Sequence, residues 1–248
     1  MVEVSGLRKL YDDKAVVDDI SFTVDKGEVF GILGPNGAGK TTTLEMMESL
    51  RPIDGGKIII DGINVAEDPE AVKRIIGVQP QTAAFQDKQK LSEIITMFAA
   101  AYGERADPKR LLEEVDLATK TNSYAEQLSG GQRQRLSIAA ALVHNPKVFF
   151  MDEPTTGLDP QARRNLWDLT RMVQAKGVTV ILTTHYMDEA ELLCDRVAIM
   201  DKGKIIALDT PHNLIKKLLA KGFKKEQHVE QANLEDVFIE LTGKALRE

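Results

Sequence analysis

One stretch of the sequence has the residue types and spacing of a phosphate-binding loop. Residues 34–41 read GPNGAGKT, which fits the pattern G-x-x-x-x-G-K-T and follows the apolar run 29–33. Glycines let the backbone aim several N–H groups at a phosphate, Lys40 reaches the β- and γ-phosphates, and the Thr41 hydroxyl binds Mg²⁺. We therefore predict a nucleoside triphosphate site between a strand and a helix over about 40–50, with contacts from Asn36, Gly37, Ala38, Gly39, Lys40, Thr41 and Thr42.

A pair of acids at the end of another apolar run is the second candidate. Residues 148–151 are apolar and are followed by Asp152 and Glu153. Asp152 can hold Mg²⁺, directly or through water, and Glu153 can polarise an attacking water, because phosphoryl transfer depends on positioning and charge stabilisation. Two merely solvated acids at a strand end are the alternative, and the phosphate loop argues against it.

A third motif, LSGGQRQR at 128–135, precedes an apolar helix over 136–143. We expect Ser129 to cap the N-terminal end of this helix and Gly130 and Gly131 to leave backbone N–H groups open to an anion. Together with Gln132 they form a second phosphate-binding segment. One chain cannot readily bend both segments onto one γ-phosphate, so we predict that two chains share the nucleotides between them.

The totals restrict the class of protein. A chain of 248 residues suits one large domain or a domain with a lobe, and its net charge of −6 argues against a dedicated nucleic-acid binder. The single cysteine, Cys194, forbids an internal disulfide and is expected to be a buried small side chain. No apolar stretch reaches the length of a membrane span and no leader is evident, so we expect a soluble protein that reaches a membrane through a partner or a surface contact.

The order of the predicted elements indicates an α/β fold. Two β-rich segments, 2–11 and 15–24, open the chain, and a short strand pair follows over about 55–64. Between about 82 and 135 apolar residues recur at helical spacing, which predicts a helical lobe inserted between strands. From 148 to 200 strands and helices alternate, with helices over 160–175 and 187–193, so we predict a mainly parallel central sheet. Phosphate loops lie at the carboxyl ends of such strands.

With these motifs in order, the sequence resembles the nucleotide-binding subunit of an ABC (ATP-binding cassette) transporter. LSGGQ is the signature of that family, and the resemblance covers about residues 1–210. It implies a P-loop NTPase with a RecA-like core, an N-terminal antiparallel β subdomain and a helical signature lobe at about 82–135. Residues 211–248 would form a short C-terminal extension.

The resemblance also assigns roles by position. It matches Tyr11 to the aromatic side chain that stacks on adenine, helped by Val16, and Gln81 to the glutamine that touches Mg²⁺ and water; Gln79 nearby is a decoy. Asp159 matches the loop that crosses the dimer interface, and His185 matches the histidine that contacts the γ-phosphate. The implied catalytic set is Lys40, Gln81, Glu153 and His185; the implied metal ligands are Thr41, Gln81 and Asp152.

The family pattern implies an active ATPase that uses ATP and Mg²⁺ and closes head to tail with a second copy or a homologous ATPase subunit. It would lie at the cytoplasmic face of the cell membrane beside an integral membrane permease, with no nucleic-acid partner. Residues 234–243 are similar to the LEDVFLxLTG tail of ATPases that serve ABC-2 type exporters, the daunorubicin and multidrug resistance group. The tail favours export of drugs, lipids or other hydrophobic compounds over import.

Other interpretations stay open at the sequence level. A soluble ABC ATPase acting on nucleic acid or ribosomes usually has tandem cassettes or long coiled coils, which this chain lacks. Glu153 and His185 argue against a non-hydrolysing regulatory subunit. Phe85 is either an anchor for the membrane subunit or part of the lobe core. The lysine-rich segment 211–225 is either a packed helix with a solvated face or a helix that touches lipid headgroups.

Overall fold

The computed structural model describes residues 1–12, 14–81, 84–86 and 88–223. Residues Met1–Leu214 form one compact unit, and a second unit begins at Ile215. A last helix, α8 (Pro211–Ala220), spans the boundary between the two. The helix expected over 234–241 lies outside the described residues. None of the helices in the described ranges is long and apolar enough to cross a bilayer.

The central sheet has six strands in the order β10-β9-β3-β8-β7-β6. All neighbouring pairs are parallel except β9 and β10, which form an antiparallel hairpin. Every residue of the three middle strands β3, β7 and β8 is buried, as expected for a sheet covered on both faces. The predicted parallel sheet is therefore confirmed; its strands are β3 (Val29–Leu33), β6 (Ile76–Gln79), β7 (Val148–Asp152), β8 (Thr179–Thr184), β9 (Arg196–Asp201) and β10 (Lys204–Asp209).

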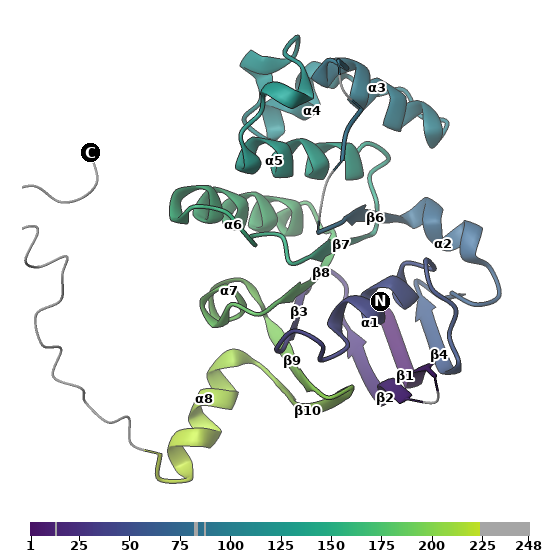
Figure 1. Ribbon diagram of the computed structural model, residues 1–248, viewed down its shortest axis with the longest axis vertical. Coiled ribbons are helices and arrows are strands. Elements are labelled where there is room, and N and C mark those ends of the chain that lie inside the picture. Colours follow the sequence, from purple (N-terminus) through teal and green to yellow (C-terminus); the bar gives the residue numbers. More distant parts are fainter. Residues whose placement is uncertain (13, 82–83, 87, 224–248) are drawn as a thin grey trace, which may run out of the picture. The chain divides into compact units, whose positions relative to one another are not determined.

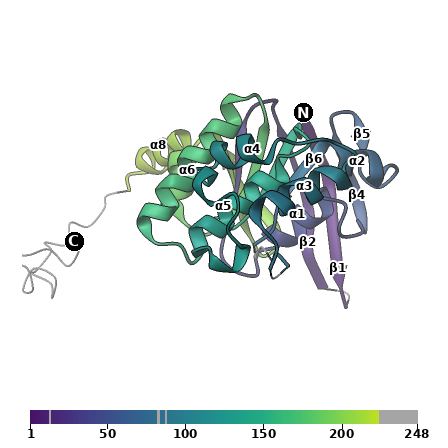
Figure 2. The same cartoon turned by 90° about the horizontal axis from the view of Figure 1, so that it is seen from above.

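A second, four-stranded antiparallel sheet has the order β2-β1-β4-β5. Side chains of β1 and β2 largely alternate between buried and exposed, which places one face of this sheet on a core and leaves the other in water. Figure 2 shows β1 and β2 on the opposite side of the first unit from α4, α5 and α6. The strands are β1 (Val2–Tyr11), β2 (Lys14–Val24), β4 (Gly55–Ile60) and β5 (Ile63–Asn64).

The helices fall into those beside the central sheet and those of a separate lobe (Figure 1). Beside the sheet lie α1 (Lys40–Met47), α2 (Pro69–Ile75), α6 (Pro160–Ala175) and α7 (Met187–Leu193). The lobe contains α3 (Leu91–Ala101), α4 (Pro108–Glu114) and α5 (Gly130–Ala141), with short 3₁₀ turns at Ala118–Lys120 and Ala125–Gln127. Phe85 is partly buried against the same core as these helices, which favours the packing interpretation of this side chain.

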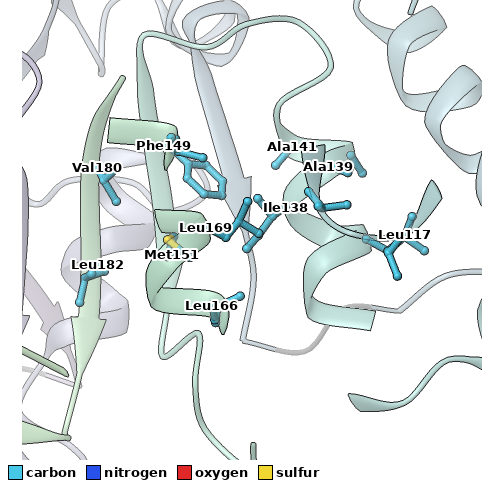
Figure 3. Close-up of a cluster of buried hydrophobic side chains, with 14 of the residues drawn as sticks. Leu117, Ile138, Ala139, Ala141, Phe149, Met151, Leu166, Leu169, Val180 and Leu182 are labelled. Atoms are coloured by element: carbon cyan, nitrogen blue, oxygen red, sulfur yellow. The ribbon is translucent and has the colours of Figure 1, made fainter. Parts of the chain in front are cut away.

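A continuous apolar cluster joins the lobe to the sheet (Figure 3). It contains Phe149 and Met151 of β7, Leu169 of α6 and Ile138 of α5, all buried. Because the packed side chains of α5, α6 and β7 belong to one cluster, the starts of both helices are held relative to the end of β7.

The largest differences from the sequence prediction concern two helices and one strand. The first helix ends at Met47 rather than about residue 50, because Ser49 takes a left-handed conformation with φ of 58°. The signature helix starts at Gly130, so its glycines lie in the first turn rather than before the helix. Strand β10 was not predicted, although the turn at Lys202 and Gly203, both with positive φ, is a hairpin signal.

Candidate nucleotide site

The phosphate loop connects β3 to α1 through glycines that no other residue could replace without strain. A Cβ on Gly34 would lie 2.2 Å from the carbonyl oxygen of Met200, and one on Gly39 would lie 2.6 Å from that of Val16. Gly39 also has φ of 101° and stands at the N-cap of α1. The close approach of these backbones fixes the loop in front of the positive end of the helix.

Lys40 is the first residue of α1, and its side chain folds back along the loop. Its Nζ donates to the carbonyl oxygen of Gly34 at 2.8 Å and forms an ion pair with Oε1 of Glu153 at 3.2 Å. Only 4% of the side chain is exposed. A buried cation therefore lies at the mouth of the loop, held by the Gly34 carbonyl oxygen of the loop and by the Glu153 carboxylate.

Thr41 and Asp152 meet at the carboxyl end of the sheet. The Thr41 hydroxyl donates to the two carboxylate oxygens of Asp152 at 3.2 and 3.1 Å, and the Thr183 hydroxyl donates to Oδ1 of the same carboxylate. Asp152 ends β7 and pairs in register with Thr183 of β8. Thr183 was missed by the sequence analysis, since only the register of the two strands brings it to this carboxylate.

Glu153 follows directly with a left-handed φ of 45°, and its N–H donates to the Thr183 carbonyl at 3.2 Å. Its Oε2 lies 3.1 Å from Nδ1 of His185 and accepts from the Thr156 hydroxyl at 3.2 Å. Burial by itself would raise the pKa of Glu153, but the hydrogen bond and charge of Lys40, together with His185, hold this pKa below its ordinary value. The carboxylate is therefore ionised and able to accept a proton or orient water.

A cavity of about 510 Å³ opens over these groups. Its walls come from the phosphate loop, Glu153 and His185. Thr156, which the sequence analysis did not select, also contributes. Its lining consists of Val16, Asn36, Gly37, Ala38, Gly39, Lys40, Thr41, Thr42, Gln81, Glu153, Thr156 and His185. The structure thus brings most of the residues predicted for one chain to a single hollow, although they come from five separate parts of the chain; Asp152 lines the neighbouring cavity instead.

The two candidate glutamines have different surroundings. Gln81 follows β6, is exposed, and lines both this cavity and a neighbouring one of about 260 Å³ together with Thr41 and Asp152. Gln79 is fully buried, and its amide donates to Gln134 of α5 at 3.2 Å. Gln79 therefore joins β6 to the lobe and, as predicted, is not a candidate for the site.

Tyr11 lies at the end of β1 and is 39% exposed. Its hydroxyl accepts a hydrogen bond from Arg51, and the cationic groups of Lys9 and Arg51 each lie 5.6 Å from its ring centroid. Within the described ranges Tyr11 is not among the residues that line the cavity. Its contact with adenine stays a prediction.

The signature residues form a second cluster away from the cavity. Ser129 caps α5 as predicted: its Oγ accepts from the Gln132 N–H at 3.3 Å, and the Gln132 side chain accepts from the Ser129 N–H at 3.1 Å. Asp159 caps α6 by accepting from the Ala162 N–H at 2.8 Å. A Cβ on Gly131 would lie 3.0 Å from that of Ala162, so the starts of α5 and α6 pack together.

Comparison with known proteins identifies the family. The model of the ABC transporter family matches residues 17–156, which is more than half of the chain. The chain belongs to the ABC transporter family. It is 41% identical over 223 residues to Nod factor export ATP-binding protein I of Rhizobium etli, covering 88% of this chain and 71% of that protein. It is 39% identical over 223 residues to the linearmycin resistance ATP-binding protein LnrL of Bacillus subtilis, covering 88% and 72%.

Solved ABC structures share the fold over nearly the whole length. An ATP-binding subunit of an ABC transporter matches with a TM-score of 0.79 and 31% identity, covering 98% of this ABC chain and 99% of the other. A bacterial ABC transporter cassette, solved as a dimer, matches with a TM-score of 0.76 and 26% identity, covering 85% and 99%. ABC cassettes bind and hydrolyse ATP, so this chain is an ATPase of the ABC family. The relatives favour the transporter subunit over an ABC protein of nucleic acid or ribosomes.

Proposed function

We propose that this ABC ATPase drives an exporter by closing head to tail with a second copy, or with a homologous subunit, over two MgATP. The observation that carries this proposal is the separation of the predicted residues into two clusters. Lys40, Thr41, Glu153 and His185 share one cavity, whereas Ser129 and its neighbours pack against the start of α6 outside it. A second chain can bring its signature helix to the open side of the cavity.

In this proposal the residues of the cavity act on the γ-phosphate and on water. A γ-phosphate in the loop offers Lys40 a second anionic partner, which competes with Glu153 for its charge. The Glu153 carboxylate then accepts a proton from water as the water attacks the phosphorus, and His185, 3.1 Å from the carboxylate, orients the carboxylate and the phosphate. The products are ADP and inorganic phosphate. N–H groups at the start of the partner's α5 would stabilise charge on the transferred phosphoryl group.

The proposed metal is Mg²⁺, held by Thr41, Asp152 and Gln81. Their hydroxyl, carboxylate and amide oxygens suit a hard cation, and Thr41 and Asp152 already lie within hydrogen-bond distance of each other. No group of three or more His, Cys, Asp or Glu side chains in the described residues could hold a metal. Mg²⁺ is usually bound through one or two carboxylates plus substrate phosphates, where it would neutralise the charge of the phosphates.

The further parts of the proposal concern domains, partners and location. We propose that residues 1–210 act as the ATPase domain, with the helical lobe at about 82–135, and that 211–248 form an extension. A membrane permease would carry the cargo at the cytoplasmic face of the cell membrane. Support for export comes from the relatives, which are named for Nod factor export and linearmycin resistance. Tyr11 is proposed to stack on adenine and Asp159 to contact the second chain.

A complementation experiment tests the shared site. Lys40→Ala disables the phosphate loop, and Ser129→Asp keeps a good helix cap while placing a negative charge where the γ-phosphate would lie. Each variant alone should lose most ATP turnover. In a mixture, heterodimers contain one site with both defects and one with neither, so part of the wild-type turnover should return. Failure of the mixture to exceed the sum of the single variants would contradict sharing between chains.

A further inference from the structure

Helix α6 contacts α7 once in every turn along one face. Arg163, Trp167 and Arg171 follow one another at intervals of four residues on α6, which places them on the same side of the helix. The Arg163 guanidinium lies 3.5 Å from the Asp188 carboxylate, and Arg171 donates to the carbonyl oxygen of Leu192 at 2.9 Å. Asp159 is the N-cap of α6, and His185 lies two residues before the start of α7 at Met187. This row of α6–α7 contacts, the seam, therefore connects two segments with proposed roles in the site.

At its first turn the seam reaches the histidine through a stack of side chains. The Arg163 guanidinium lies 4.3 Å from the ring centroid of Tyr186, and the Tyr186 ring lies 4.2 Å from that of His185. Arg163 is only 22% exposed, and its buried Nε has no hydrogen-bond partner among the described residues. The guanidinium therefore depends on the ring and on Asp188 for its position.

One turn further along α6, Trp167 makes the next contact with α7. Glu189 of α7 is fully buried, and Trp167 donates to its Oε1 at 3.2 Å. Burial raises the pKa of Glu189, and the Thr184 and Thr155 hydroxyls, Trp167 and the charge of Arg163 offset this only in part. Neither Oε2 of Glu189 nor the Thr155 hydroxyl has a hydrogen-bond partner of acceptable geometry in the described part of the chain. The Trp167–Glu189 hydrogen bond therefore joins α6 to α7 one turn beyond Arg163.

We propose that Arg163 is a positioning residue, which acts through Tyr186 to hold His185 against Glu153. The position of the imidazole ring then depends on α6. This inference rests on the proposed function, because it assumes that His185 takes part in hydrolysis. The chain of contacts begins in the first turn of α6, where the backbone N–H of Arg163 donates to the Asp159 carbonyl oxygen at 3.0 Å. It ends at the 3.1 Å contact of His185 with Glu153.

The physical reason lies in the mobility of the imidazole. His185 follows the end of β8, its side chain is 31% exposed, and its polar partner among the described residues is Glu153. A ring held only from one side can rotate away from the cavity, and a displacement of about 1 Å can cost up to about a hundredfold in rate. The Tyr186 ring contacts the imidazole at a centroid distance of 4.2 Å, and the Arg163 guanidinium lies over the Tyr186 ring.

Single-turnover ATP hydrolysis of purified variants tests this inference. Arg163→Ala should lower the hydrolysis rate about tenfold while KM for ATP and Tm change little, because binding groups in the loop are untouched. Arg163→Lys keeps a cation over the ring and should recover much of the rate. Tyr186→Ala should behave like Arg163→Ala, whereas Tyr186→Phe, which keeps the ring, should behave like the wild type. Arg164→Ala is the matched control, since Arg164 is the exposed next residue of α6.

The decisive result is a double-mutant cycle with His185→Ala. If Arg163 acts through the histidine, Arg163→Ala should cause no further loss once His185 is absent. A wild-type rate for Arg163→Ala, or a loss that multiplies fully with that of His185→Ala, overturns the inference. Should Arg163→Ala fail to fold, the comparison of Tyr186→Ala with Tyr186→Phe decides in the same way. A His185→Ala variant with normal turnover would instead refute the histidine's role in the proposed function.

Discussion

Among the single residues beside the site, Glu48 has a strongly raised pKa. It caps the C-terminal end of α1, is buried, and lines the smaller cavity beside Thr41 and Asp152. Burial, and after it the charges of Asp152 and Glu45, raise its pKa to about 8 from an ordinary value of 4.5. At neutral pH Glu48 is therefore mostly protonated.

This shift predicts a pH dependence of stability. The folded state holds the Glu48 proton up to about pH 8, whereas the unfolded state releases it near pH 4.5. The free energy of unfolding should therefore fall as pH rises between these values, by at most about 1.4 kcal/mol per pH unit. Glu48→Gln cannot ionise and should remove this slope. Urea unfolding without nucleotide or Mg²⁺ at pH 5.5 and 7.5 measures it, with exposed Glu3→Gln as control. Parallel pH profiles for Glu48→Gln and wild type would refute the shift.

Residue chemistry was predictable where a motif fixes it. The glycines, Lys40 and Thr41 follow from one pattern, and Glu153 from its place after an apolar strand. Thr183 and Arg163 were not predictable, because their importance arises from strand register and from the packing of two helices. Such partners depend on the tertiary structure, and the sequence around them carries no local signal.

At the scale of elements, the helix caps position the signature cluster. Asp159 accepts the Ala162 N–H and precedes Pro160, which is a favoured first helical residue. Asp159→Ala should lower the free energy of unfolding by about 1 kcal/mol, whereas Asp159→Asn, which keeps an acceptor, should change it by only a few tenths. Denaturant unfolding of the chain without nucleotide measures this. Equal losses in both variants would show that the side-chain acceptor is not what stabilises the start of α6.

Elements with strong local signals matched their predicted bounds best. The helices at Pro160–Ala175 and Met187–Leu193 agree with prediction, since a cap or turn and a clear apolar period mark them. Strand β10 escaped prediction although residues 205–208 are a short apolar run beside the turn at Lys202 and Gly203; its residues are exposed or half-buried in the structure. The predicted Ser129 cap agrees with the start of α5, whereas the apolar stretch named for this helix, 136–143, covers only its later part and omits Gly130 and Gly131. Their helical turn is stabilised by the Ser129 and Gln132 capping pair.

For the molecule as a whole, the proposed nucleotide site requires two chains. The first unit presents a cavity with one set of residues and, apart from it, a signature cluster with the complementary set. The sequence predicted this division from two separate phosphate-binding segments, whereas it could not predict how the lobe is held on the sheet. That depends on the cluster formed by Ile138, Phe149 and Leu169, whose side chains come from three distant elements.

The measurement that tests the central claim most directly is the mass of Glu153→Gln in solution, by size exclusion with light scattering, with and without MgATP. The amide cannot accept the proton of the attacking water, so bound ATP should persist and hold two chains together. We predict a monomer without nucleotide, a dimer with MgATP, and no dimer when Ser129→Asp is added. A Glu153→Gln protein that turns over ATP at the wild-type rate, or that binds MgATP and stays monomeric, would contradict the account.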